Sequence, residues 1–399
     1  MKSISYIIDP DGDVELLLKQ PNSHKLVPYD PSDDLDRESE DRMNKPTVAC
    51  GALDAKYHEF DDLLSPAEDE EEEDPGLPGT KVCRWLTKAL STTETPSTSE
   101  AGTPPGDEVH MRVSSRHLTL ASRVFRTLIQ GLWAETSSTS LHFGKPLRQV
   151  TAEDWDAVAL AIVLDIIHGR HGHVPRVIDL RLMTHIATIV DFYECHEVAK
   201  IFSETWYKNM STEFEDEYPR QTLLWLSVSW VLPNQEVFDR AAQAILKHMD
   251  GRQLNTDNLP LHKVLPKIED KRLELINQIV KALYDLLDTL PNSDYFCGWR
   301  KFDSPTCHSI ALSILVRELE RLESCDPPFE PPFNGHSIMS MIQLVNDIPE
   351  SIAATTEEYD HYHDVSVCSV RGRMRHVLGD VKAEMNSWTL NLNMNVRAG

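Results

Sequence analysis

The sequence predicts an α+β protein: a small sheet with helices, interrupted by an acidic insert and followed by an all-helical region. Strand-like runs occur at 3–20, and apolar and polar residues alternate at 109–113, as on a strand with one buried face. Beyond residue 121 apolar residues recur at the spacing of amphipathic helices. Residues 30–74 carry 18 acidic and four basic side chains, a composition that does not support a packed core.

These patterns divide the chain into five segments. They are a first hairpin of a split domain at 1–27, an acidic disordered insert at 28–108, the remainder of that domain at 109–215, a helical region at 216–348 and a flexible tail at 349–399.

The first segment reads as a β-hairpin. Ser3–Ile8 and Val14–Lys19 have the composition of strands. They flank Asp9-Pro10-Asp11-Gly12, in which proline and glycine suit a tight turn. We therefore expect the two strands to pair with each other.

The insert is rich in Asp, Glu, Ser, Thr, Pro and Gly. It holds too little apolar surface to offset the entropy of ordering, so we predict a solvated segment without a fixed fold. Two islands, Tyr57–Leu64 and Val82–Leu90, are more apolar. The alternative for these islands is a pair of short helices or docking motifs.

Order resumes with an abrupt strand-to-helix corner. Val109, Met111 and Val113 alternate as on a strand, and from Ala121 onward the apolar residues fall on a helical stripe. The joint between them, Ser114-Ser115-Arg116-His117, contains neither glycine nor proline. A further short strand is expected at 141–143.

Three helices follow the corner. The spacing of Thr151 and Asp154 resembles a capping box before an apolar stripe that runs from Trp155 to Ile167, and Gly169 stands where that helix should end. The next two stripes are Leu182, Ile186, Ile189, Val190 and Tyr193, and then Val198, Ile201, Phe202, Thr205 and Trp206.

The C-terminal region is helical throughout in its pattern. Prolines separate five stripes, at 223–230, 237–245, 273–287, 310–322 and 338–348. After residue 348 the polarity becomes mixed. The basic cluster Arg371–His376 is expected to belong to an exposed tail.

Composition limits the function. The net charge of −25 argues against nucleic-acid partners and against docking on an anionic membrane. The seven cysteines never form a Cys-x-x-Cys pair, which is typical of a reducing compartment. The N-terminal residues do not form a secretion signal, and no apolar run is long enough to span a bilayer. We expect an intracellular protein without a cofactor.

Three groups of residues invite a catalytic or metal-binding interpretation. His168, His171 and His173 lie in HGRHGH, but Gly169 and Gly172 favour a helix-to-loop exit over a ligand set. Cys195 and His196 are adjacent, and adjacent residues on a helix point about 100° apart. Cys297, Cys307-His308 and Cys325 have no compact zinc spacing. The common nucleotide-binding and hydrolase motifs are absent from the sequence. We therefore predict that the protein is not an enzyme.

In combination, these motifs resemble the BTB/POZ domain of a large group of fungal proteins. DPDGDVELLL at 9–18 resembles that group's first strand pair, and VSSRHLTLASRVFRTLI at 113–129 resembles its corner and first helices. Residues 162–180 and 186–198 match the later helices. The signature positions are His117, Leu118, Ser122 and Phe125. The acidic insert, and the lack of a recognisable reader module downstream, depart from the family pattern.

The resemblance implies a scaffold for protein–protein contact. Family members commonly dimerise through the first strand and helix, so a homodimer or another protein partner is expected. Some members bind cullin scaffolds of ubiquitin ligases through an apolar-x-Glu pattern, which Leu132, Trp133 and Glu135 follow loosely. A substrate adaptor is therefore the second hypothesis, and a metal-dependent enzyme using His168, His171 and His173 is the third.

Overall fold

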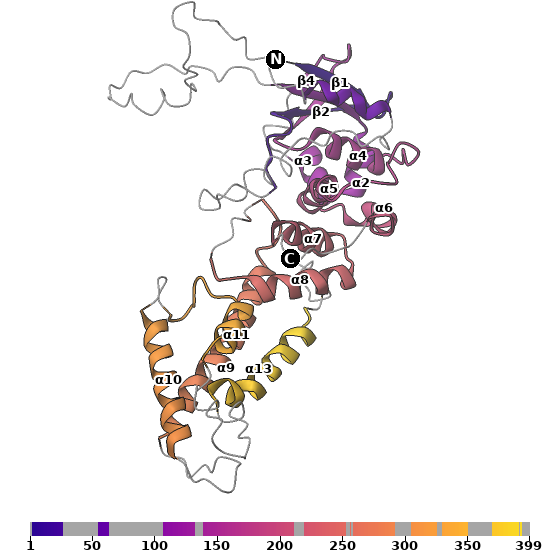
Figure 1. The fold of residues 1–399 in the computed structure, drawn as a ribbon. Helices are drawn as coiled ribbons and strands as arrows, with labels where there is room; N and C mark the ends of the chain where they lie inside the picture. The colour runs from indigo at the N-terminus through magenta and orange to yellow at the C-terminus, as the bar shows by residue number, and fades with distance from the viewer. Residues whose placement is uncertain are drawn as a thin grey trace, which may run out of the picture. The chain divides into compact units, whose positions relative to one another are not determined.

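The fold is seen in a computed structural model of the 399-residue chain (Figure 1). It combines a curled five-stranded sheet with helices. Two compact units are present, one formed by residues 1–24 and 45–175 and the other by 25–44 and 176–399. The structure describes residues 2–26, 55–63, 107–131, 139–210, 219–252, 256, 258–291, 305–324, 329–349, 369–390 and 392.

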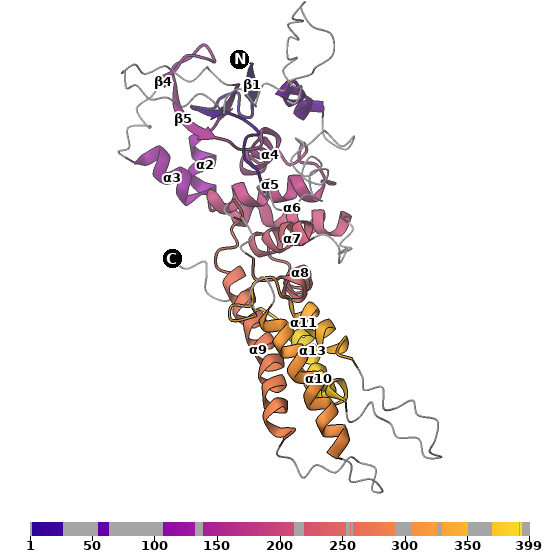
Figure 2. The same ribbon diagram turned by 60° about the vertical axis from the view of Figure 1, so that its left-hand side comes forward.

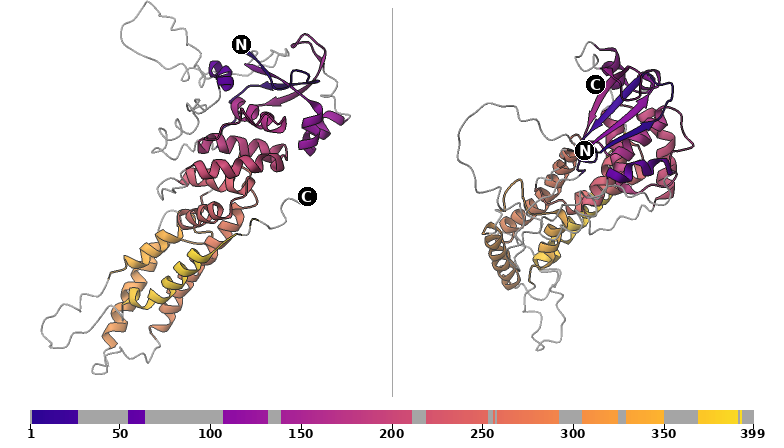
Figure 3. Two further views of the ribbon diagram at one scale, coloured as in Figure 1. Left: turned by 90° about the vertical axis from the view of Figure 1, so that its right-hand side faces the viewer. Right: turned by 90° about the horizontal axis from the view of Figure 1, so that it is seen from above.

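The sheet of the first unit is built around β3 (Glu108–Val113). Its strand order is β1-β3-β2-β5-β4, and the right-hand view of Figure 3 shows these strands from above. β1 (Ser3–Ile7) pairs with β3 in parallel, and β2 (Val14–Lys19) pairs with it antiparallel. The N-terminal segment therefore does join the strand at Val109 across the acidic insert, as the resemblance implied.

The predicted pairing within the hairpin is wrong. Both strands exist, but β1 and β2 do not pair with each other, because β3 lies between them. The short turn at 9–13 carries the chain across the end of β3, so β1 and β2 lie on opposite sides of that strand. The strand order depends on β3, which lies about ninety positions further along the sequence. The residues of a local turn do not indicate so distant a partner.

The far side of the sheet also differs from expectation. β4 is Thr139–Ser140, just before the predicted 141–143, and β5 (Leu147–Glu153) was not predicted. β5 pairs in parallel with β2. It ends where a capping box was expected, and the helix α4 (Ala157–Ile167) is capped instead by Asp156, whose side chain accepts the N–H of Ala159.

The corner after β3 leads into two short helices. They are α2 (Ser115–Ala121) and α3 (Arg123–Gln130), and Ser122 separates them. Ser122 caps α3 by accepting the backbone N–H of Phe125 at 2.9 Å. The predicted helical stripe is present, with Phe125 and Ile129 buried.

Part of the insert is folded. Residues 55–63 form the 3-10 helix η1 (Ala55–Leu63), visible in Figure 2 as the small dark violet helix near β1. Tyr57 and Phe60 are buried within the first unit, where η1 contacts β1 and α4. The prediction of a solvated insert is therefore wrong at these residues, and the alternative of a short docked helix is confirmed there. The second island, Val82–Leu90, lies outside the described residues.

The regular secondary structure of the second unit is helical throughout its described residues. α5 and α6 group with it, so the compact units divide at Pro175, before the predicted 215. The helices are α5 (Leu180–Phe192), α6 (His196–Asn209), α7 (Pro219–Val231), α8 (Gln235–His248), α9 (Leu265–Thr289), α10 (Pro305–Glu323), α11 (Ile338–Asn346) and α13 (Val370–Ser387).

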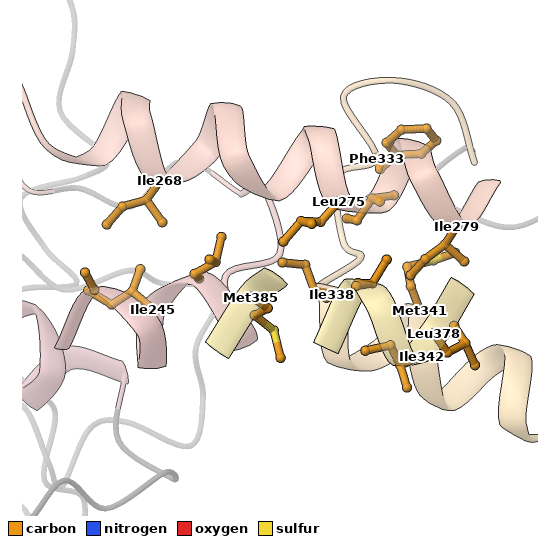
Figure 4. Close-up of a cluster of buried hydrophobic side chains, with 14 of the residues drawn as sticks. Ile245, Ile268, Leu275, Ile279, Phe333, Ile338, Met341, Ile342, Leu378 and Met385 are labelled. Carbon is orange, nitrogen blue, oxygen red and sulfur yellow. The ribbon is translucent and has the colours of Figure 1, made fainter. Parts of the chain in front are cut away.

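One hydrophobic core joins α7 to α13 (Figure 4). Leu275 and Ile279 of α9 lie close to Met341 of α11 and Leu378 of α13 in this core. The five stripes predicted from 223 to 348 are all helices, because each supplies one buried face to this core.

The predicted flexible tail contains a core helix. α13 buries Val370, Met374, Leu378, Val381 and Met385, which recur every three or four residues and form one stripe. The side chain of Ser369 caps the helix by accepting the N–H of Gly372 at 3.0 Å. The basic cluster 371–376 lies on the first turns of α13 rather than on an exposed tail, and Arg371 donates to the backbone carbonyl of Asn346.

Candidate functional site at the strand-to-helix corner

The turn at Asp9–Asp13 docks on the end of β3. The backbone N–H groups of Ile8 and Asp9 both donate to the carbonyl of Arg112 at 3.1 Å. A Cβ atom on Gly12 would lie 2.5 Å from the carbonyl oxygen of Val113. Only glycine allows this approach, so the glycine of the turn is required by a contact with β3 and not by a hairpin.

Asp13 precedes the insert in the sequence and binds the corner that follows the insert. Its carboxylate accepts the backbone N–H of Ser115 at 2.8 Å and the hydroxyl of Ser115 at 2.7 Å. Ser114, which stands at the helix N-cap, makes no side-chain cap. Burial alone would raise the pKa of Asp13, but the two bonds from Ser115 lower it below its usual value. α2 thus begins on a carboxylate that stays ionised at neutral pH.

His168 holds the corner from α4. Its Nε2 accepts the backbone N–H of Ser114 at 2.9 Å, and its Nδ1 lies 2.7 Å from the carbonyl of Leu164. These partners assign a neutral imidazole that carries its proton on Nδ1. Burial lowers the pKa of His168 and so favours this neutral form. The corner needs neither glycine nor proline because the side chains of Asp13 and His168 hold its backbone.

The four signature residues occupy structural positions. Leu118 and Phe125 are completely buried, and Ser122 caps α3. The exposed ring of His117 lies 5.0 Å from that of His168. All four residues lie on α2, on α3 or at the cap between them.

The histidines of HGRHGH separate in the structure. Both ring nitrogens of His168 are used within the corner. His171 is exposed, and Nε2 of His173 lies 3.4 Å from an Arg170 nitrogen. In the part of the chain that the structure describes, no three or more His, Cys, Asp or Glu side chains are arranged to hold a metal ion.

Cys195 and His196 have different partners in the structure. The Cys195 thiol is buried 3.9 Å from the carbonyl of Val190, and burial raises its pKa to about 12. His196 instead lies 3.4 Å from Asp191. A thiol with a raised pKa holds little thiolate at neutral pH, and the thiolate is the nucleophilic form. Of the other cysteine cluster, Cys297 and Cys325 lie outside the described residues.

Sequence reasoning missed a buried polar cluster on the outer face of the sheet. Glu15 of β2 is completely buried, 2.9 Å from Nδ1 of His110, and accepts the Gln149 amide at 3.1 Å. The ring of His142 stacks on His110 with centroids 3.7 Å apart and reaches Ser5 of β1 at 2.6 Å. The signal was a charged residue and a histidine within apolar strands.

The carboxylate of Glu15 lies at the centre of this cluster. Burial would raise the pKa of Glu15, but hydrogen bonds from Ser140, His110 and Gln149 lower it. The pKa of His142 is lowered by burial and by the neighbouring His110. The arrangement ties β1, β2, β3 and β5 together.

The predicted cullin-contact residues come directly after α3. Leu132, Trp133 and Glu135 lie outside the described residues. The cullin hypothesis therefore stays a prediction.

Comparisons with known families, curated proteins and solved structures find no match for this chain. Within the described residues, no helix combines the length and the apolar character that a membrane crossing needs.

Proposed function

We propose that the chain is a non-enzymatic protein–protein interaction scaffold built on a BTB/POZ-like first unit, and that it works by self-association. The observation that carries the proposal is the open outer edge of β1. This strand ends the sheet order, and in the described residues no strand pairs with its outer side. An edge strand presents unpaired backbone groups that can bind another chain.

The direction of the backbone groups identifies the available edge. Lys2 accepts from Glu108, and Ile8 donates to Arg112, so the even-numbered residues of this segment face β3. Since backbone groups alternate along a strand, those of Ser3 and Ser5 face outward. The carbonyl of Ile7 also faces outward, and Arg170 and Lys56 approach it at 3.4 and 3.5 Å.

Large apolar side chains of the first unit are exposed, and one of them lies on β1. Ile7 is 44% exposed on β1, and Leu120 is 82% exposed on α2. The resemblance to BTB/POZ domains assigns dimerisation to the first strand and the first helix, the two elements that carry these side chains. The exposed Ile7 on the open edge strand supports partner docking over a purely monomeric role.

The test is the mass of the full-length chain in solution. We expect twice the single-chain mass of 45.4 kDa at micromolar concentration, and we expect the Ser5→Pro variant to return to the single-chain mass. Proline at this position removes an outward N–H and leaves the pairing with β3 intact. Sedimentation velocity measures both masses.

The matched control is His142→Ala, which removes the side-chain contact of Ser5 but leaves its backbone edge unchanged. This variant should keep the double mass. A wild-type chain that stays single, or a Ser5→Pro variant that still doubles, contradicts the proposal.

A further inference from the structure

The helix η1 is fastened to the first unit by three side chains. Tyr57 and Phe60 are each 1% exposed, whereas His58, Glu59 and Asp61 are exposed. Lys56 lies with its ammonium 4.0 Å from the ring centroid of Tyr6. One face of η1 is therefore recognised and the opposite face is solvated.

The surface that receives η1 has a buried carboxyl group at its centre. Asp165 of α4 is completely buried and accepts hydroxyl hydrogen bonds from Tyr6 at 2.7 Å and from Tyr57 at 3.0 Å, both on Oδ2. Its Oδ1 lies 3.7 Å from the ammonium of Lys56 and 3.9 Å from Nε of Arg170. A buried carboxylate requires such partners, and η1 supplies two of them.

Aromatic packing completes the recognition. The ring of Tyr6 lies 5.2 Å from that of Phe60 and 6.3 Å from that of Tyr57. The surface therefore contacts three groups of η1: the cation of Lys56, the phenol of Tyr57 and the aromatic ring of Phe60. We define the η1 seat as Tyr6, Asp165 and Arg170.

η1 has the properties of a bound ligand rather than of a framework element. A single 3-10 helix of this length has little stability of its own and is ordered by what it contacts. It is joined to β2 and β3 by the long sequences 20–54 and 64–107. Docking through such connections resembles an intramolecular binding event, governed by an effective concentration.

We propose that the η1 seat is a peptide-recognition site for segments of the pattern Lys-Tyr-x-x-Phe, and that residues 55–63 are its ligand in cis. A partner protein that carries the same pattern competes with η1 for the seat. The buried Asp165 selects the cation and the phenol, and Tyr6 selects the second aromatic ring. The proposal goes beyond self-association, because peptide binding is measured on a chain of any mass.

The test uses a full-length chain whose seat is emptied by Tyr57→Ala with Phe60→Ala. A fluorescent peptide of residues 54–65 is titrated into this variant and into the wild type, and anisotropy reports binding. We expect saturable binding to the emptied chain and at least tenfold weaker binding to the wild type, whose own segment occupies the seat.

The matched controls are variants of the peptide, which leave the protein unchanged. The His58→Ala peptide should bind the emptied chain as well as the natural sequence, since His58 is exposed. The Phe60→Ala and Lys56→Gln peptides should bind at least tenfold more weakly. A benzophenone at position 60 of the peptide should crosslink to the segment that contains Tyr6 or to the segment that contains Asp165.

Two results overturn the proposal. One is a folded emptied chain that fails to bind the peptide or binds all the peptide variants alike. The other is loss of hydrogen-exchange protection in β3 of the emptied chain, because η1 would then be an integral part of the fold. Neither result depends on the oligomeric mass, so failure here is distinguishable from failure of the self-association proposal.

Discussion

Replacement of Arg272 by alanine is expected to lower the free energy of unfolding of the second unit by about 3–5 kcal/mol, the cost of breaking a buried ion pair. Arg272 lies on α9 and is completely buried. Its guanidinium donates to both carboxylate oxygens of Glu269, at 2.8 and 2.6 Å. It is the only charged side chain with no exposed surface among the described residues of α9.

The same guanidinium holds the loop before α11. It donates to the backbone carbonyls of Pro332 at 2.6 Å, Phe333 at 3.2 Å and His336 at 2.6 Å. Without Arg272 these carbonyls lose their charged donor, and the loop loses its anchor to α9. A buried acceptor left without a partner carries its full desolvation penalty.

Hydrogen exchange with mass spectrometry measures this effect, because it reads each unit separately. Peptides from α9 and α11 should exchange about two to four orders of magnitude faster in Arg272→Ala, while β3 should be unchanged. The control is Arg317→Ala, an exposed arginine 3.7 Å from Glu318, whose exchange should match the wild type. Equal rates for both variants would remove the anchoring role of Arg272.

Replacement of Phe125 by alanine is expected to cost the first unit about 3–5 kcal/mol, the usual loss for a buried phenylalanine. Phe125 has no exposed surface, and its backbone N–H is the donor that Ser122 accepts at the start of α3. Truncation at this position leaves a cavity beneath the corner. The corner should therefore open before the rest of the unit.

Amide exchange in α3 and β3 measures that loss. Gln130→Ala, on the exposed end of the same helix, is the control and should leave the rates within a factor of about two, since surface changes alter stability by only about 0.5 kcal/mol. Wild-type rates in Phe125→Ala would show that α3 does not contribute to the core of this unit.

The sequence predicts the strands better than their order. Strand-like composition at 3–8 and 14–19 and alternation at 109–113 identify three real strands. Their arrangement depends on the contact between Gly12 and Val113 and on the bonds from Asp13 to Ser115, which join residues a hundred positions apart. β5 was missed because few of its side chains are apolar and it lacks clear alternation.

Two ordered elements, η1 and α13, lie in stretches whose composition is mostly polar. η1 lies in an acidic stretch, and only the pair Tyr57 and Phe60 distinguishes it. α13 has glycines and charged residues, but its stripe from Val370 to Met385 follows the helical period and could have been found. The average polarity of a segment therefore does not show whether one face of a helix in it is buried.

The polar interactions could not be predicted from the residues alone. Arg272 resembles any surface arginine in the sequence, and its role comes from three carbonyls supplied by a later loop. Glu15 and Asp165 were unusual as charged residues within apolar runs, at 14–18 and 157–167. That signal indicates a buried partner without naming it.

The central claim is that the N-terminal strands close on β3 across the insert, and a designed disulfide tests it most directly. Lys19 and Glu108 lie opposite each other. Gln20 donates to the carbonyl of Asp107, so these two residues form a hydrogen-bonded pair. The adjoining Lys19–Glu108 pair is therefore a non-hydrogen-bonded pair, in which the Cα atoms lie about 4.5 Å apart. That spacing suits a disulfide.

Mild oxidation of the native Lys19→Cys, Glu108→Cys variant should link the two peptides within one chain, as read by mass spectrometry. The Lys19→Cys, Arg112→Cys control moves the second cysteine about 13 Å along β3 and should not link. No link in the first variant, or equal linking in both, would contradict the pairing on which the closed first unit depends.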